Sequence, residues 1–270
     1  MKRKLLTRGL VCLTACLLAP YLALADSDHE GRNSCQSAPS FSAVQSALIA
    51  VVTGGGNSGF GLNMWATVVS RDGVVCVVTF SGADRGSQWP GSRVISAQKA
   101  NTANAFSLPG FALSTANLYS AVQPGGSLFG LQESNPVDTG VAYGGNSNNY
   151  GQPNDPMVGQ KIGGVNVFGG GLAMYDKTGA LVGAIGVSGD TSCTDHVIAW
   201  KVRHALNFDN VPAGEAPGAP KGTDNIIFDI KPDANGHPVS FGGFGHPACD
   251  AAVVGIGNML PTKFPVGPNP

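Results

Sequence analysis

Charged residues are scarce in this chain of 270 residues: Asp, Glu, Lys and Arg together make up 12% of it, and the formal net charge is −1. No stripe of basic residues runs along the sequence, so nucleic acid is not an expected partner. Glycine, by contrast, is abundant, with 39 residues. Few charges and much glycine are typical of a compact exported domain with many loops, and they argue against a disordered chain.

Several motifs of catalysis and metal binding are also absent. The chain has no Cys-x-x-Cys pair, which argues against a zinc ribbon or a thioredoxin-type redox motif. It has no phosphate-binding Gly-Lys-Ser/Thr loop and no dinucleotide fingerprint after a strand. Ser188 lies in Gly-Val-Ser-Gly, which lacks the spacing of a nucleophile elbow. We therefore expect Ser188 to be a turn residue rather than a hydrolytic nucleophile.

The first 25 residues have the pattern of a secretory signal peptide. Basic residues at positions 2–4 and 8 precede an apolar stretch, and Ala-Leu-Ala before Asp26 is a suitable cleavage site. The spacing of Leu-Thr-Ala-Cys16 also fits a lipobox, which stays open as an alternative. No other apolar run is long enough to span a bilayer. The sequence predicts a periplasmic or secreted protein that is cleaved near Ala25 and has no transmembrane segment.

Four cysteines remain after the expected cleavage: Cys35, Cys76, Cys193 and Cys249. An even number of cysteines in an oxidising compartment predicts two disulfide bonds. Four cysteines allow three pairings, and the sequence does not choose among them. Cys76 lies among valines, so a buried free thiol is the alternative at that position.

Two β-hairpins form the predicted sheet. In the first, Met64–Ser70 and Val74–Phe80 flank an Arg-Asp-Gly turn. In the second, Gly170–Tyr175 and Leu181–Val187 flank the turn Asp-Lys-Thr-Gly. The short apolar stretch Val165–Phe168 is expected to add a fifth strand.

Helices are predicted before, between and after these hairpins, from apolar residues at helical spacing. The first begins after the N-cap candidate Ser40, the second covers 92–106 and the third covers 195–206. A short helix is also expected within 115–122. This order predicts an α+β fold, in which helices pack on one antiparallel sheet of about five strands.

Composition divides the chain into four parts. The signal peptide (1–25) is followed by a polar lead-in (26–39), a domain (40–206) and a tail (207–270). Pro and Gly at the start of the tail indicate a linker, and the tail has too little apolar sequence for a core of its own. We expect it to wrap around the domain. Inside the domain, a polar loop from 124 to 164 is long enough to act as a lid.

Glycines interrupt the strand of the second hairpin at Gly183 and Gly186. Glycine weakens a strand unless something must approach the backbone closely. The strand ends at Ser188-Gly189, shortly before the predicted helix start at Asp195. Because a helix N-terminus attracts negative charge, this end of the sheet is expected to bind an anionic group.

Several of these segments resemble the GlcG/HbpS-like family, also called the haem-binding or haem-degrading family, which includes the C-terminal domain of PduO-type proteins. The resemblance covers roughly residues 40–206. Where relatives usually carry Asp-Gly-Ala before the second helix, this chain has Arg85-Gly-Ser. The matching segments are Lys99-Ala-Asn-Thr-Ala103, Gly170-Gly171, the run Val182–Gly189, and Asp195.

The resemblance implies a profilin-like single domain, haem or another tetrapyrrole as the ligand, and a symmetric homo-oligomer. It leaves open whether haem is also slowly degraded by oxidation. One alternative is an accessory factor or enzyme that acts on a small organic acid. A second alternative is a structural or interaction protein without a small ligand.

Candidate site residues follow from this interpretation. Cationic side chains suit haem propionates or an organic acid, because guanidinium and ammonium groups pair with carboxylates. A neutral imidazole can bind haem iron, which indicates His196 at the helix start, or His246 if the tail folds back. The expected ligand-binding residues are Lys99, Arg85, Arg93, Gly186, Ser188, Gly189 and Asp195.

Overall fold

The computed structural model describes residues 34–218 and 221–267. The predicted signal peptide, with its lipobox alternative at Cys16, lies outside the described residues. Among the residues that are described, no helix is both long and apolar enough to cross a membrane.

Four antiparallel strands form the central sheet, in the order β2-β1-β4-β3. Both predicted hairpins are present, and they join where β1 pairs with β4, with Trp65 opposite Ser188. The α+β prediction is therefore confirmed, with four strands where about five were expected. The strands are β1 (Trp65–Ser70), β2 (Val75–Phe80), β3 (Gly171–Tyr175) and β4 (Leu181–Ser188).

The fifth strand expected at Val165–Phe168 is wrong, because this segment does not pair with the sheet. Its backbone bonds to side chains instead: the Asn166 amide donates to Thr102 Oγ1 at 3.0 Å, and the Phe168 carbonyl accepts from Thr115 Oγ1 at 2.5 Å. Val165 and Val167 are nevertheless buried. The apolar residues at positions 165 and 167 therefore reflect burial of this segment, and they do not indicate strand pairing.

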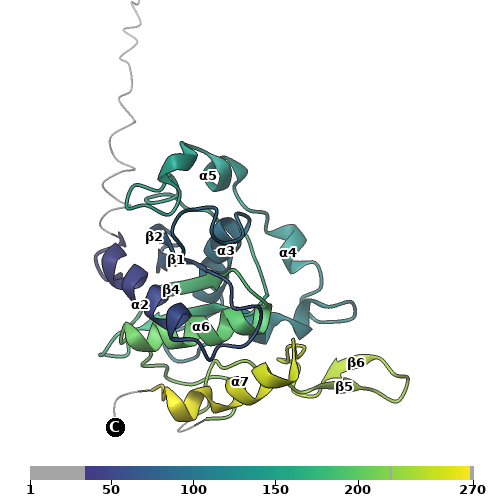
Figure 1. The fold of residues 1–270 in the computed structure, drawn as a ribbon. Helices are drawn as coiled ribbons and strands as arrows, with labels where there is room; N and C mark the ends of the chain where they lie inside the picture. The colour runs from purple at the N-terminus through teal and green to yellow at the C-terminus, as the bar shows by residue number, and fades with distance from the viewer. Residues whose placement is uncertain (1–33, 219–220, 268–270) are drawn as a thin grey trace, which may run out of the picture.

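Helices cover both faces of the sheet (Figure 1). α3 (Ser92–Ala105) packs on one face through a row of alanines. α2 (Phe41–Gly54) and α6 (Ser192–Ala205) pack on the other face, in the larger of the hydrophobic cores. The predicted N-cap of α2 is confirmed, since the amide of Ala43 donates to Ser40 Oγ at 3.3 Å. α6 begins three residues earlier than expected because Thr191 caps it.

Glycine lets α3 approach the sheet closely. A Cβ atom at Gly186 would lie 2.0 Å from the Ser96 carbonyl oxygen, and one at Gly171 would lie 2.5 Å from the Lys99 carbonyl oxygen. Both contacts are too short for any side chain. The backbone that approaches these strand glycines is therefore that of α3, rather than a ligand.

Two long segments outside the sheet contain short helices. Between α3 and β3, the chain forms α4 (Leu131–Ser134), α5 (Thr139–Tyr143) and three short 3-10 helices. The 3-10 helices are η1 (Thr115–Leu118), η2 (Ser120–Val122) and η3 (Ser147–Asn149), and the first two account for the short helix expected at 115–122.

The tail contains structure that the sequence analysis did not predict. It forms a small hairpin of β5 (Ile230–Pro232) and β6 (Pro238–Ser240), followed by α7 (Ala251–Lys263). α7 lies along α6 (Figure 1), and the Trp200 indole donates to the Phe264 carbonyl at 3.0 Å. The buried residues of α7 are Val253, Gly257 and Leu260.

Two disulfide bonds are present, which confirms the expected number and fixes the pairing. Cys35 bonds to Cys76 and ties the segment before α2 to strand β2. Cys193 bonds to Cys249 and ties the first turn of α6 to the tail. The alternative of a buried free thiol at Cys76 is therefore wrong.

Candidate functional site

The Lys99 and Asp195 side chains form a buried ion pair between α3 and α6. Lys99 Nζ lies 2.6 Å from Asp195 Oδ2 and donates to the Val187 carbonyl at 3.1 Å. Neither side chain reaches solvent. Burial lowers the pKa of Lys99, and burial raises the pKa of Asp195 to about 6. In this arrangement Lys99 already has a carboxylate partner from the protein itself.

The turn after β4 holds an anion, and that anion is Asp195. Its Oδ1 accepts from the Gly189 amide at 3.1 Å and from the Asp190 amide at 2.9 Å. Ser188 is buried, and a Cβ atom at Gly189 would lie 2.5 Å from the Asn63 carbonyl oxygen. The anionic group at this turn is therefore a carboxylate of α6, from the chain itself. Gly186, Ser188 and Gly189 join β4 to its neighbours and line none of the cavities described below.

His196 is fully buried under the tail. Its Nε2 accepts from the Ile226 amide at 3.1 Å and lies 3.2 Å from Asn225 Oδ1. Burial lowers the pKa of His196 to about 3, so the ring is neutral at physiological pH. An iron atom could reach this nitrogen only if the tail segment around Asn225 moved away from His196.

The tail folds back so that His246 contacts the domain, which is the condition under which the sequence made His246 a candidate iron ligand. Its Nδ1 must carry the proton, because it bonds to the Pro247 carbonyl oxygen at 2.7 Å. Its Nε2 then accepts from Ser192 Oγ at 2.7 Å, and burial lowers the pKa of His246 to about 4. Both ring nitrogens are occupied by protein partners, so His246 fastens the tail in this structure.

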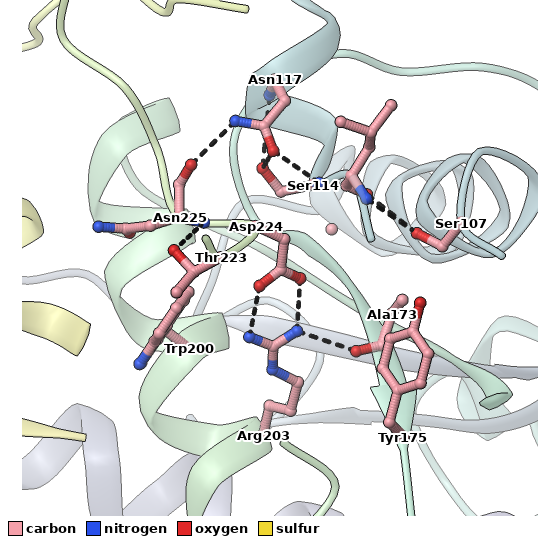
Figure 2. A network of polar contacts seen from close by, with 12 residues as sticks. Ser107, Ser114, Asn117, Ala173, Tyr175, Trp200, Arg203, Thr223, Asp224 and Asn225 are labelled. Carbon is pink, nitrogen blue, oxygen red and sulfur yellow. Dashed lines mark hydrogen bonds and ion pairs between the residues drawn. The ribbon is translucent and has the colours of Figure 1, made fainter. Parts of the chain in front are cut away.

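Figure 2 shows a buried polar network that the sequence analysis missed. Arg203 on α6 donates to both oxygens of Asp224, at 2.6 and 2.9 Å, and to the Ala173 carbonyl at 2.9 Å. The side-chain amide of Asn117 donates to the Asn225 carbonyl at 2.9 Å. All these polar side chains are buried. The network holds Asp224 and Asn225 of the tail against the domain, where they cover His196. Only the helical position of Arg203 among apolar neighbours could have signalled it.

Arg85 and Arg93 are brought together at a mostly apolar cleft of about 370 Å³. The Arg93 guanidinium stacks 3.7 Å above the centre of the Tyr150 ring, and its Nε donates to Asp155 Oδ2 at 2.9 Å. Arg85 is exposed at the cleft. We call this feature the aromatic cleft; its lining residues are Trp65, Arg85, Gly86, Pro90, Gly91, Arg93, Val94, Tyr143, Ser147 and Tyr150.

The two arginines differ in what they can offer a ligand. Arg93 is buried, and its charge is neutralised by Asp155. Arg85 is free to turn toward a carboxylate that enters the cleft. Tyr143 is 64% exposed, so its phenol also faces solvent at this site. The aromatic cleft can therefore hold a flat apolar ligand that carries an acidic group.

A larger cavity, of about 790 Å³, separates the segment around η2 from the β5–β6 hairpin. We call it the tail cavity. Its walls come from Tyr119–Ser127 on the domain and from residues between Ile230 and Pro247 on the tail. His237 lies at this cavity with its imidazole largely exposed. Among the described residues, no group of three or more His, Cys, Asp or Glu could hold a metal ion.

Solved structures that match this chain include a PduOC:haem complex, at 22% identity and a TM-score of 0.43, covering 62% of this chain and 91% of that chain. Protein ORFY from Klebsiella pneumoniae is 25% identical with a TM-score of 0.42, covering 62% of this chain and 90% of that one. HbpS is 19% identical with a TM-score of 0.39, covering 61% of this chain and 86% of that one.

No curated protein sequence matches the chain. The model of the family described as haem-degrading protein HbpS-like matches residues 42–203, which is more than half of the chain. The matched region contains the whole four-stranded sheet, helix α3 and the aromatic cleft. On this match, the chain belongs to the HbpS-like haem-degrading family.

Proposed function

We propose that this protein is an exported haem-binding protein, or a binder of a related tetrapyrrole, and that the ligand occupies the aromatic cleft. The observation that carries the proposal is an apolar cleft with aromatic walls and an exposed arginine, on a chain of the HbpS-like family. Its volume of about 370 Å³ lies in the usual range for small-molecule sites. The family membership also motivates a symmetric homo-oligomer.

The chemistry of the cleft fits haem. Tyr150 and Tyr143 offer ring surfaces on which a flat macrocycle can stack. Arg85 can pair with a propionate, while Arg93, held by Asp155, keeps the Tyr150 ring in place. Tyrosine is among the residue types that hold haem iron, so Tyr143 is our candidate iron ligand. Bound haem would supply redox chemistry at iron, and slow oxidative haem degradation is the further activity that this proposal includes.

A haem titration of the folded protein tests the site. We expect a Soret band that saturates at micromolar haem. Arg85→Ala should weaken haem binding about tenfold without moving the band, because it removes one charge-assisted bond. Tyr143→Phe should shift the band, because the iron would lose its ligand.

Matched variants at the tail cavity serve as controls for this titration. Tyr119→Phe and His237→Ala line that cavity and should leave both affinity and spectrum unchanged. A band shift in His237→Ala with an unchanged spectrum in Tyr143→Phe would place haem in the tail cavity instead. If the parent protein binds no haem, but a small organic acid protects Arg85 from modification, the organic-acid alternative is favoured.

Export makes a separate prediction. Protein recovered from the periplasm or the medium should begin at Asp26, because a signal peptidase would cut after Ala25. N-terminal sequencing by mass spectrometry checks this. A retained leader, or a lipid on Cys16, would contradict it.

A further inference from the structure

The disulfide between Cys193 and Cys249 is asymmetric in its exposure. Cys193 is the second residue of α6 and is fully buried, whereas Cys249 lies in the tail and is exposed. The backbone amide of Cys193 donates to Cys249 Sγ at 3.2 Å. A thiol from solvent can therefore approach the disulfide from the side of Cys249, while Cys193 stays buried at the N-terminus of α6.

The surroundings of this disulfide would stabilise its reduced form. A Cys249 thiolate would keep the amide of Cys193 as a hydrogen-bond donor, and the positive end of the α6 dipole favours a thiolate there. Cys193 Sγ lies 3.5 Å from the Pro247 carbonyl oxygen, which could accept from a Cys193 thiol. Both products of reduction thus have partners in place. Ready partners for the reduced state make a disulfide easier to reduce.

The residues just before Cys249 in the tail form the base of the β5–β6 hairpin. Next to the disulfide, His246 bonds to Ser192 at 2.7 Å, and its ring lies 4.9 Å from the Tyr119 ring. The His246 amide donates to the Ile227 carbonyl at 2.8 Å, which closes the hairpin. Ser120 Oγ donates to the Gly245 carbonyl at 2.6 Å. These contacts hold one wall of the tail cavity against the other.

The second disulfide has a different setting. Cys76 lies on the edge strand β2, between Val75 and Val77, which both pair with β1, and both Cys35 and Cys76 are half-buried. Cys76 Sγ lies 3.4 Å from the Val74 carbonyl oxygen, an acceptor that would not stabilise a thiolate. We expect this disulfide to be structural.

We propose that Cys193–Cys249 is a thiol-exchange site at which a dithiol reductant releases the base of the tail hairpin and opens the tail cavity. A thiolate of the reductant attacks Cys249 Sγ, forms a mixed disulfide and expels Cys193 as a thiolate, which takes up a proton. The second thiol of the reductant then attacks the sulfur atom that the reductant contributed to the mixed disulfide, and it expels Cys249 as a thiolate, which also takes up a proton. The protein gains two electrons and two protons, and the reductant becomes a disulfide.

Graded reduction of the full-length mature protein tests the exchange site. The protein is treated with increasing dithiothreitol, quenched with N-ethylmaleimide and mapped by mass spectrometry. We expect Cys193 and Cys249 to be alkylated at a dithiothreitol concentration at least tenfold lower than Cys35 and Cys76. With glutathione instead, the mixed disulfide should form on Cys249. Simultaneous reduction of the two disulfides, or earlier reduction of Cys35–Cys76, would overturn the proposal.

Hydrogen exchange tests the opening of the cavity independently. After selective reduction, deuterium uptake in residues 230–247 should rise severalfold, while uptake in α3 should stay the same. The double variant Cys193→Ser/Cys249→Ser should reproduce the rise without any reductant. The matched variant Cys35→Ser/Cys76→Ser should not show it. Unchanged uptake in residues 230–247 on selective reduction would contradict the proposal that the Cys193–Cys249 disulfide keeps the tail cavity closed.

Discussion

Replacing Lys99 by methionine should lower the free energy of unfolding by about 3–5 kcal/mol, measured by chemical denaturation of the haem-free protein. The change leaves the Asp195 carboxylate buried without its cation, and breaking a buried ion pair from one side carries a cost of this size. The sequence-based interpretation, with Lys99 in a ligand pocket, instead predicts a loss of affinity with little change in stability. The two interpretations are thus separated by one measurement.

Two controls make the Lys99 result specific. Lys99→Met combined with Asp195→Asn removes both charges and keeps an oxygen to accept from the Gly189 and Asp190 amides, so it should recover most of the lost stability. Lys177→Met, at an exposed turn position, should change stability by less than about 0.5 kcal/mol. Full stability in Lys99→Met would mean that the pair contributes nothing and would contradict our account of the α3–α6 contact.

The fold was readable from the sequence where local signals agree with tertiary structure. Strands β1 and β2 combine β-branched residues with an Asp-Gly turn, and α2 combines an apolar face with the Ser40 cap. α7 could not be found in this way, since Gly255, Gly257 and Pro261 all weaken the helical pattern. It is held by its packing on α6 and by an Asp250 cap.

The site was less readable than the fold, because burial of polar groups depends on distant partners. Lys99 looks like a solvent-facing or ligand-facing cation in sequence, but its partner is 96 residues away in the chain. Arg93 is likewise paired with a distant carboxylate, that of Asp155 in the long loop. Of the three predicted cations, only Arg85 remains exposed, at a position where the family resemblance itself breaks down.

The disulfide pairing shows the same limit. The number of bonds followed from the count of cysteines and the expected compartment. The pairing needed the path of the tail, and that path is set by contacts such as the Arg203–Asp224 pair and the packing of α7. No local pattern in the sequence encodes those contacts.

The protein should lose stability between pH 7 and pH 5 because of its buried histidines. In the unfolded chain an imidazole takes up a proton near pH 6.5, but burial lowers the pKa of His246 to about 4 and that of His196 to about 3. The unfolded state therefore binds more protons in this range, and acid favours it. The stabilisation is complete above pH 6.5, and each imidazole should lose about 2 kcal/mol of it by pH 5.

Asp195 acts in the opposite direction. Its pKa is raised to about 6 in the folded state by burial, so below that pH the folded state binds the extra proton and gains about 1 kcal/mol by pH 5. The expected net loss is thus roughly 2–3 kcal/mol between pH 7 and pH 5. Urea titrations at half-unit pH steps would measure it. A free energy of unfolding that stays flat over this range would contradict the burial of both rings.

Histidine variants assign the acid sensitivity to individual rings. His246→Gln removes one titrating group while keeping polar atoms near Ser192 and Pro247, so it should reduce the loss by about 2 kcal/mol, whatever its effect on stability at pH 7. His237→Gln, at an exposed imidazole, should keep the pH profile of the parent protein. Because His246 adjoins the Cys193–Cys249 bond, acid should also loosen the base of the tail hairpin before the rest of the fold. Deuterium uptake in residues 230–247 should then rise at pH 5 while that of α3 stays low, and an equal rise in both would mean that the two regions open together.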